Sequence, residues 1–221
     1  MIRIGVVGAI GSGKSYVSKS FGFPLFNADA EVAKLYKKDK KIFIKLKKVL
    51  PKYFDSFPVK KKEVADAILA NNINLKKIIK IIHTSIKKKL QNFLKINKKK
   101  KDIKSLIPLL LKKKINKKKN KKTFKKKKKK KKIVILDIPL LLENKINKKK
   151  DVLIFVQSKQ SIINKKLKKR KGYNKKLFYR FKNIQLSLNH KKKKSHFIIN
   201  NDFTKKTVEK YVKHILGEIL K

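Results

Sequence analysis

The sequence predicts an α/β fold, a parallel β-sheet flanked by helices. Three apolar, β-branched runs have the length and composition of buried strands: Ile2–Val7, Ile133–Ile138 and Val152–Val156. Segments with helical periodicity lie between them, and 221 residues suffice for one domain with a substantial core. Strands that alternate with helices are typical of a parallel sheet covered on both faces.

The same signals place the remaining elements. Apolar residues recur at helical spacing between Val59 and Leu94, and Asn71-Asn72 divides this stretch into separate helices. Thr204 is suited to cap a helix that runs to Leu220. The other predicted helices are Lys14–Phe21, Ala30–Tyr36, Ser161–Leu167 and Lys175–Leu188. The other predicted strands are Phe23–Phe26 and Phe197–Ile199.

The chain is strongly basic, with 67 lysines and arginines against 13 acidic residues and a formal net charge of +54. Such a chain could bind nucleic acid. However, its arginines are only Arg3, Arg170 and Arg180, and proteins that read phosphates or bases favour the paired donors of arginine. We therefore attribute the lysine excess to drift in an AT-rich genome and expect no specific nucleic-acid partner. A lysine-coated nucleic-acid-binding protein is the alternative.

Cysteine is absent, which excludes disulfides and thiolate zinc sites. The first residues read as a strand rather than as an apolar leader with a cleavage site. No apolar run reaches membrane-spanning length. We expect a cytoplasmic protein without a membrane partner, and the sequence gives no indication of the oligomeric state.

Residues 97–132 interrupt the pattern as a lysine-rich insertion. The segment ends in eight consecutive lysines, Lys125–Lys132, which cannot pack into a core, and we expect it to be disordered. It also contains IPLLLKKKINKKK at 107–119, which matches IPLLLENKINKKK at 138–150 in 11 of 13 positions. Two copies do not make a repeat protein, so we interpret the first as a decayed duplication.

The stretch GAIGSGKS at residues 8–15 fits the P-loop pattern G-x-x-x-x-G-K-[ST]. Its glycines permit backbone torsions that turn successive N–H groups toward an anion, and the following helix adds the positive end of its dipole. Lys14 would reach the β- and γ-phosphates of a nucleotide, and the Ser15 hydroxyl would bind Mg²⁺. A preceding strand and a following helix support a nucleotide-phosphate site.

Two carboxylates follow predicted strands, where a parallel sheet presents its carboxyl ends to a ligand. Asp29 comes after the second strand and could orient an acceptor hydroxyl, take its proton or hold the metal. It could equally cap the helix that begins at Ala30. Asp137 resembles the aspartate of a Walker-B strand, but it could also be an ordinary turn residue. The residues alone leave both alternatives open.

Three further residues are candidates for the site. Arg170 lies in a basic segment before Gly172, where a kinase lid would bring positive charge to the transferred phosphoryl group. Glu143 follows the Asp137 strand and is either a helix-start or a substrate-site residue. His83 lies on an apolar helix face, where a structural histidine is the commoner outcome.

Together these motifs resemble the dephospho-CoA kinase family. GAIGSGKSY and the NAD of residues 27–29 correspond to the family's GGIGSGKST and DAD. KIIKIIHTSI places His83 on the family histidine, and VILDIPLLLE corresponds to the turn PLLFE with its preceding strand. The remaining matches are Lys166 and Arg170 on two lid arginines, Gln185 on a glutamine and Asn201 on an asparagine.

The resemblance implies ATP-dependent phosphorylation of the ribose 3′-hydroxyl of dephospho-CoA, the last step of coenzyme A synthesis. Asp29 would activate that hydroxyl, while Lys14 and Arg170 would neutralise charge on the moving phosphoryl group. The residues expected to bind ATP are Gly11, Ser12, Gly13, Lys14, Ser15 and Tyr16, with Ser15 as the Mg²⁺ ligand. The residues expected to bind dephospho-CoA are His83, Pro139, Leu140 and Glu143.

The expected organisation is a single P-loop kinase domain over residues 1–221. Residues 1–58 and 133–221 would form the core, with a lid near 159–190 and a helical acceptor-binding region at 59–96. The chain departs from the family pattern at Asn27, Ala9 and Thr84. Another small P-loop kinase, acting on a nucleoside or nucleotide, is the alternative that shares the ATP site.

Overall fold

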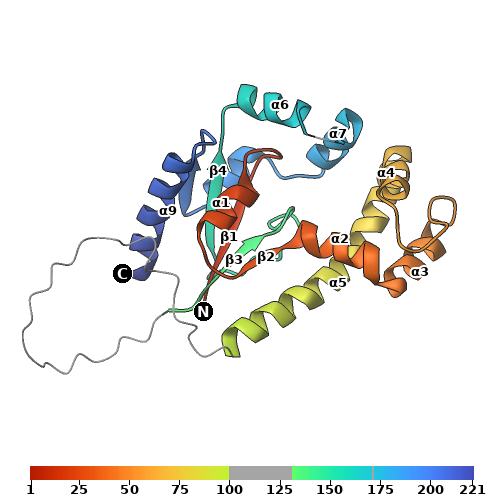
Figure 1. The fold of residues 1–221 in the computed structure, drawn as a ribbon, viewed down its shortest axis with the longest axis horizontal. Coiled ribbons are helices and arrows are strands. Elements are labelled where there is room, and N and C mark those ends of the chain that lie inside the picture. Colours follow the sequence, from red (N-terminus) through yellow and green to blue (C-terminus); the bar gives the residue numbers. More distant parts are fainter. Residues whose placement is uncertain (100–130, 171) are drawn as a thin grey trace, which may run out of the picture.

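A computed structural model describes residues 1–99, 131–170 and 172–221. Its strands are β1 (Ile2–Gly8), β2 (Leu25–Asn27), β3 (Ile133–Asp137), β4 (Val152–Gln157) and β5 (Phe197–Asn200). They form one sheet in the order β2-β3-β1-β4-β5, and every neighbouring pair is parallel (Figure 1). The predicted helix-flanked parallel sheet is confirmed.

The helices cover both faces of the sheet and extend beyond it. Those of the first half of the chain are α1 (Lys14–Ser20), α2 (Ala28–Lys38), α3 (Lys40–Val49), α4 (Lys61–Ala70) and α5 (Asn72–Lys99). Those of the second half are α6 (Gln160–Lys168), α7 (Lys175–Asn183), α8 (Leu188–Lys193) and α9 (Lys205–Leu220). In Figure 1, α2–α5 reach out from one side of the sheet, and α6 follows the carboxyl end of β4.

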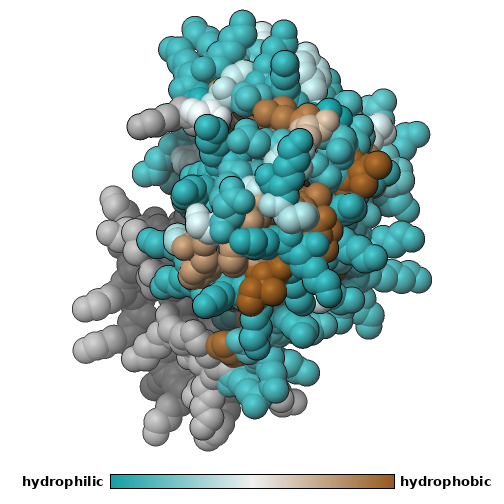
Figure 2. All heavy atoms as spheres, turned by 90° about the vertical axis from the view of Figure 1, so that its right-hand side faces the viewer, coloured by the Kyte–Doolittle hydropathy of each residue, from teal (hydrophilic) through white to brown (hydrophobic). Residues whose placement is uncertain are grey.

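Two apolar clusters fill the two sides of the sheet, because side chains alternate along each strand. Ile4 packs in one cluster with Val17 of α1 and Val212 of α9. Val7, from the same strand, packs in the other cluster with residues of α2–α5 such as Leu75. The face that carries the protruding helices is mainly hydrophilic, with apolar side chains in a discontinuous band (Figure 2). Among the described residues, no helix is both long and apolar enough to cross a bilayer.

Side-chain caps decide where several helices begin. The Thr204 hydroxyl accepts a hydrogen bond from the Thr207 N–H at 3.3 Å, which confirms the predicted cap of α9. Helix α3 was not predicted, although Asp39 accepts from two N–H groups of its first turn. Ile42 and Leu46, one turn apart, are both buried. The capping aspartate and this pair are the signals that could have revealed the helix.

The predicted helix Lys175–Leu188 is divided in the structure. Helix α7 ends at Asn183, and the Ser187 hydroxyl caps α8 by accepting from the His190 N–H at 3.2 Å. Between them the Leu186 N–H donates to Glu143 Oε1 at 3.0 Å. Acceptors on side chains thus take backbone donors that a continuous helix would have used, and the helix stops.

The predicted lysine-rich insertion overlaps the end of a helix. Helix α5 continues to Lys99, so the first three residues of the predicted segment, 97–99, are helical. At the other end, the Lys132 carbonyl accepts from the Ile2 N–H at 2.7 Å next to the β1–β3 pair. The remainder of the segment, including the 107–119 copy of the repeat, lies outside the described residues.

A buried ion pair joins the start of the central strand β1 to the loop before β4. Arg3 Nη2 lies 2.9 Å from Asp151 Oδ2 and 3.3 Å from the Ile146 carbonyl oxygen. Both side chains are buried. Burial raises the pKa of Asp151, and the Lys148 N–H and the Arg3 guanidinium oppose that rise. The pair therefore fixes the 146–151 loop against β1.

Replacing Arg3 with methionine should destabilise the fold by about 3 kcal/mol or more at pH 7, because it leaves the Asp151 carboxylate buried without its cation. Urea unfolding measures the loss, which should shrink as Asp151 is protonated at lower pH. Glu209→Gln removes one partner of an exposed pair with Lys205 and should cost under about 0.5 kcal/mol. Equal losses in the two variants would contradict the role of the Arg3 pair.

Candidate active site

The loop between β1 and α1 has the conformation that its sequence predicts. Gly8 and Gly13 have φ angles of 146° and 88°, a region that only glycine enters freely. A Cβ atom on Gly13 would also overlap the Asn201 amide. Ala9 is absent from the described non-glycine residues with positive φ, so alanine is tolerated at this departure from the family pattern.

The ends of two other strands hold this loop in place. The Ser12 carbonyl oxygen accepts hydrogen bonds from Asn201 Nδ2 at 2.8 Å and from Ser158 Oγ at 3.1 Å. Asn201 follows β5, and Ser158 follows β4. The resemblance placed Asn201 without giving it a role, and Ser158 was not predicted at all. Both are polar residues at strand ends, which is the only sequence signal they carry.

Lys14 lies folded over the loop in this structure. Its Nζ donates to the Ala9 carbonyl at 2.7 Å and to the Gly8 carbonyl at 3.3 Å. Burial lowers the pKa of Lys14 from 10.5 to about 8, against the opposing attraction of Asp137, while Lys191 lowers it further. The ammonium group is therefore partly dehydrated at the phosphate-binding loop. An anionic ligand bound there would stabilise its charged form.

The ends of β2 and β3 bring Asn27 and Asp137 side by side. These residues are partners in the parallel register, and Asn27 Nδ2 donates to Asp137 Oδ2 at 2.6 Å. The Asn27 Oδ1 caps α2 by accepting from the Ala30 N–H at 2.7 Å. The capping role considered for Asp29 is thus wrong, because Asn27 performs it. Asp137 is buried next to Lys14 rather than in a solvated turn.

Asp29 lies in the first turn of α2 with its side chain open to solvent. Crowding by neighbouring protein raises its pKa, as does Asp137, whereas Lys14 and Arg170 lower it. Arg170 itself is exposed just after α6. Two of the predicted catalytic residues, Lys14 and Arg170, therefore act electrostatically on the third, Asp29.

A cavity of about 500 Å³ opens between α5 and the turn that follows β3. It brings together three of the predicted acceptor residues, His83, Leu140 and Glu143. Pro139 is exposed and does not line it. His83 Nε2 is buried without a hydrogen bond from any described residue, unlike the satisfied structural histidine expected from its apolar face. The other lining residues are Lys76, Ile79, Lys80, Asn144 and Ile184.

The two cavity lysines were not predicted as site residues. Lys76 and Lys80 are four residues apart on α5, and His83 follows three residues later, so all three share one helix face. That spacing was readable from the sequence. In a chain with this many lysines, however, these two differ from the rest only because the turn after β3 lies opposite them across the cavity.

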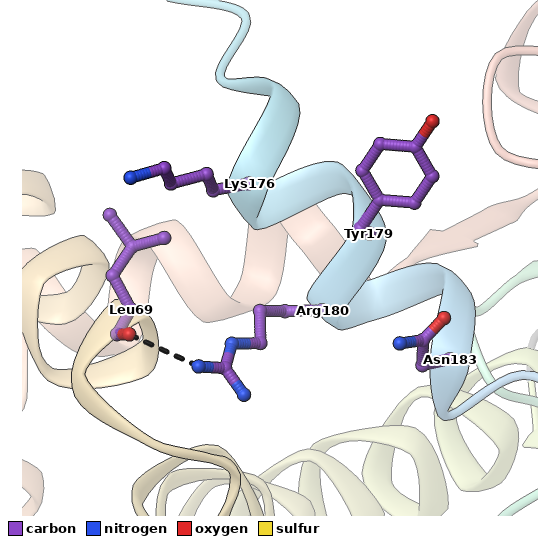
Figure 3. Close-up of a pocket in the computed structure, with 5 residues that line it drawn as sticks. All are labelled: Leu69, Lys176, Tyr179, Arg180 and Asn183. Carbon is purple, nitrogen blue, oxygen red and sulfur yellow. Dashed lines mark hydrogen bonds between the residues drawn. The ribbon is translucent and has the colours of Figure 1, made fainter.

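A second cavity, of about 300 Å³, lies between α4 and α7 (Figure 3). None of the predicted site residues lines it. Its main feature is Arg180, whose guanidinium donates to the Leu69 carbonyl at 3.3 Å and to the Asn72 side chain. In Figure 3, Lys176 and Tyr179 extend away from each other. Through these hydrogen bonds Arg180 connects α7 to the corner between α4 and α5.

Few protein ligands are available for a metal. The described residues contain no group of three or more His, Cys, Asp or Glu side chains able to hold an ion. Ser15, the predicted Mg²⁺ ligand, is exposed at the start of α1.

Comparison with known proteins decides the family. The profile of the dephospho-CoA kinase family matches residues 2–124 and 117–207, which together cover most of the chain. This chain belongs to the dephospho-CoA kinase family. The family catalyses the final step of coenzyme A biosynthesis, so the predicted kinase class and family are confirmed. The two matched segments overlap at 117–124, within the lysine-rich part of the sequence.

Individual relatives agree with this assignment. A dephospho-CoA kinase of Wolbachia pipientis is 28% identical over 219 residues, which is 98% of this chain and 97% of that protein. A dephospho-CoA kinase of Bartonella henselae is 31% identical over 116 residues, covering 50% of this chain and 59% of that protein.

Solved structures share the fold at lower identity. The Thermus thermophilus protein TT1252 superposes with a TM-score of 0.69 at 19% identity, covering 100% of this chain and 98% of that one. A dephospho-CoA kinase from Campylobacter jejuni gives 0.55 at 17% identity, covering 99% and 97%.

ATP binding should weaken as the pH rises above about 8, because the free protein then loses the Lys14 proton that an anionic phosphate requires. One proton linked to binding raises Kd roughly tenfold per pH unit above that pKa. Calorimetric titration with ATP between pH 7 and 9.5 measures the slope. In Lys14→Arg the guanidinium stays charged, so the slope should disappear. A flat profile in the wild-type protein would contradict the assignment of Lys14.

Proposed function

We propose that this chain transfers the γ-phosphoryl group of ATP to the ribose 3′-hydroxyl of dephospho-CoA. The observation that carries the proposal is that Asp29, in the first turn of α2, is close enough to Lys14 of the P-loop and to Arg170 for both to lower its pKa. The cavity lined by His83 and Glu143 supplies a place for the acceptor. Membership of the dephospho-CoA kinase family supports the choice of acceptor.

The ATP phosphates would lie against the loop from Gly11 to Gly13 and the start of α1. The backbone N–H groups of Lys14, Ser15 and Tyr16 begin a helix and have no earlier turn to donate to, so they are suited to hold an anion. On binding, Lys14 Nζ would exchange the carbonyl oxygens of the loop for phosphate oxygens. Its position over the loop means that only a side-chain rotation is needed.

Asp29 would orient the 3′-hydroxyl and accept its proton. Its raised pKa moves the carboxylate toward the range in which it can take a proton at neutral pH, while Lys14 and Arg170 keep it from rising further. Arg170 and Lys14 would balance the charge that spreads over the transferred group. Positioning and electrostatics then supply most of the rate, because phosphoryl transfer asks little covalent chemistry of the protein.

Mg²⁺ would be held by the Ser15 hydroxyl, with Asp137 as a second oxygen donor, and bound there it would neutralise charge on the phosphates. Asp137 fits because Asn27 fixes its Oδ2 by a hydrogen bond and thereby orients the carboxylate. The family's aspartate at position 27 is absent, so this chain offers one carboxylate fewer. A cytoplasmic location is part of the same proposal, because ATP and coenzyme A precursors are found there.

The acceptor would occupy the cavity between α5 and the turn after β3. Leu140 and Ile79 provide apolar contact, while His83 and Glu143 offer hydrogen-bonding groups. The exposed Pro139 would contact the acceptor only at the edge of the cavity. The ammonium groups of Lys76 and Lys80 are available to the diphosphate of the acceptor.

The test is a coupled assay with ATP, Mg²⁺ and a panel of acceptors: dephospho-CoA, nucleosides and nucleoside monophosphates. The proposal predicts turnover with dephospho-CoA alone and a product that carries the new phosphate at the 3′ position, as ³¹P NMR would show. Preferred phosphorylation of a nucleoside or nucleotide would favour the alternative small-molecule kinase. ATP hydrolysis stimulated by nucleic acid, without transfer, would favour the nucleic-acid-binding alternative.

Asp29→Asn should lower kcat at least about 100-fold, because it keeps the shape of the side chain but removes the charge that holds and accepts the hydroxyl proton. The KM for ATP should change little. Steady-state kinetics measure both constants. Asp55→Asn is the matched control, since that side chain is exposed and only the backbone of Asp55 takes part in hydrogen bonds with described residues. Near-normal turnover in Asp29→Asn would refute the role of Asp29.

A further inference from the structure

Lys191 is unusual among the lysines of this chain because it is buried. Its side chain is 4% exposed, and no other lysine of the described residues is in the buried set. Its Nζ lies 2.8 Å from Glu143 Oε1 and 2.8 Å from Gln185 Oε1. The adjacent Lys192 and Lys193 on α8 are exposed. Neighbouring lysines of this helix are thus solvated, whereas specific partners hold the Lys191 side chain in the interior.

Withdrawing an ammonium from water costs several kcal/mol unless partners replace the lost hydration. Glu143 supplies the opposite charge and Gln185 a second acceptor. The same Glu143 oxygen also accepts from the Leu186 N–H at 3.0 Å. The pair thus joins three segments: the turn after β3, and, more than 40 residues later in the sequence, the loop between α7 and α8 and α8 itself.

The turn that carries Glu143 is strained at both ends. Leu140 and Lys145 have φ angles of 59° and 51°, a left-handed conformation that is unfavourable for non-glycine residues. Hydrogen bonds within the turn, from the Asn144 N–H to the Leu140 carbonyl and from the Lys145 N–H to the Leu142 carbonyl, close it. Such a conformation persists only where the surroundings hold it, and the buried pair with Lys191 does so.

Two of the three joined segments form the wall of the acceptor cavity. Leu140, Glu143 and Asn144 line it from the turn, and Ile184 lines it from the loop before α8. Lys191 does not line the cavity. Lys191 therefore has no contact of its own with the acceptor and acts on the cavity wall through Glu143 and the turn, while its charge also lowers the pKa of Lys14 at the P-loop.

We infer that Lys191 is a positioning residue for dephospho-CoA: by pairing with Glu143 it sets the shape and charge of the cavity wall that the acceptor contacts. The inference rests on the proposed function, because it assigns the cavity to that acceptor. Without Lys191, the Glu143 carboxylate is buried next to Leu186 with no cation, and either it turns toward the cavity or the strained turn relaxes. Both outcomes change the acceptor site and leave the P-loop contacts in place.

The experiment compares Lys191→Met with Lys193→Met, which removes the same charge from an exposed position of the same helix. Lys191→Met should raise the KM for dephospho-CoA at least about tenfold and weaken its calorimetric Kd in parallel. At pH 7, where Lys14 is mostly charged with or without Lys191, the Kd for ATP should stay within about threefold. Lys193→Met should leave all three constants within about twofold. Lys191→Arg, which keeps the charge, should recover part of the loss.

The same substitution of Lys191 is then made in a protein that already carries Glu143→Gln. If Lys191 acts through Glu143, Lys191→Met should change the KM for dephospho-CoA by less than about twofold once Glu143 is already neutral. An equal rise in both backgrounds, or a rise shared by ATP and dephospho-CoA, would overturn the inference. Should Lys191→Met not fold, Lys191→Gln tests the same selective rise with a neutral donor in place.

Failure of the inference and failure of the proposed function give different results. A wild-type protein that binds and phosphorylates a different acceptor would overturn the proposed function. A wild-type protein that phosphorylates dephospho-CoA, with a Lys191→Met variant of unchanged acceptor affinity, would overturn the role of Lys191 alone.

Discussion

The Ser12 carbonyl oxygen is the point on which the site depends. It accepts hydrogen bonds from Asn201 after β5 and from Ser158 after β4, so two strand ends hold the middle of the P-loop. The glycine torsions on either side permit the loop but do not fix it, since glycine has the most freedom of any residue. With the loop fixed, Lys14 starts α1 at a defined place against the sheet, and its ammonium lies over the loop carbonyls.

The parallel sheet then brings the remaining chemistry to the same edge. Strands β2 and β3 end in register, which places Asn27 against Asp137, and α2 starts there with Asp29 in its first turn. Asn27 replaces a family aspartate, yet it both caps α2 and orients Asp137. Its neutral amide avoids a second negative charge beside Asp137, which would have raised the pKa of Asp29 further. The family's carboxylate is thus exchanged for a donor that fixes its neighbour.

Sequence patterns predicted much of this architecture because its signals are local. The glycine spacing of the P-loop, the apolar strands and the Thr204 cap each involve residues close in the chain. Contacts between distant segments were not predictable: Lys191 with Glu143, Arg180 with Leu69, and Ser158 with Ser12. The helix cap considered for Asp29 belongs instead to Asn27, through a local contact with the Ala30 N–H that the predicted helix start at Ala30 had missed. Among so many lysines, composition alone could not distinguish the buried Lys191.

The central claim is that the edge of the sheet aligns a nucleotide phosphate with an alcohol held by Asp29. A crystal structure with Mg²⁺, a non-hydrolysable ATP analogue and dephospho-CoA tests it most directly. The account predicts the terminal phosphorus about 3–3.5 Å from the ribose 3′-oxygen, with the Asp29 carboxylate within hydrogen-bonding distance of that oxygen. A 3′-hydroxyl bound out of reach of Asp29, or an analogue whose phosphates lie away from the P-loop, would contradict it.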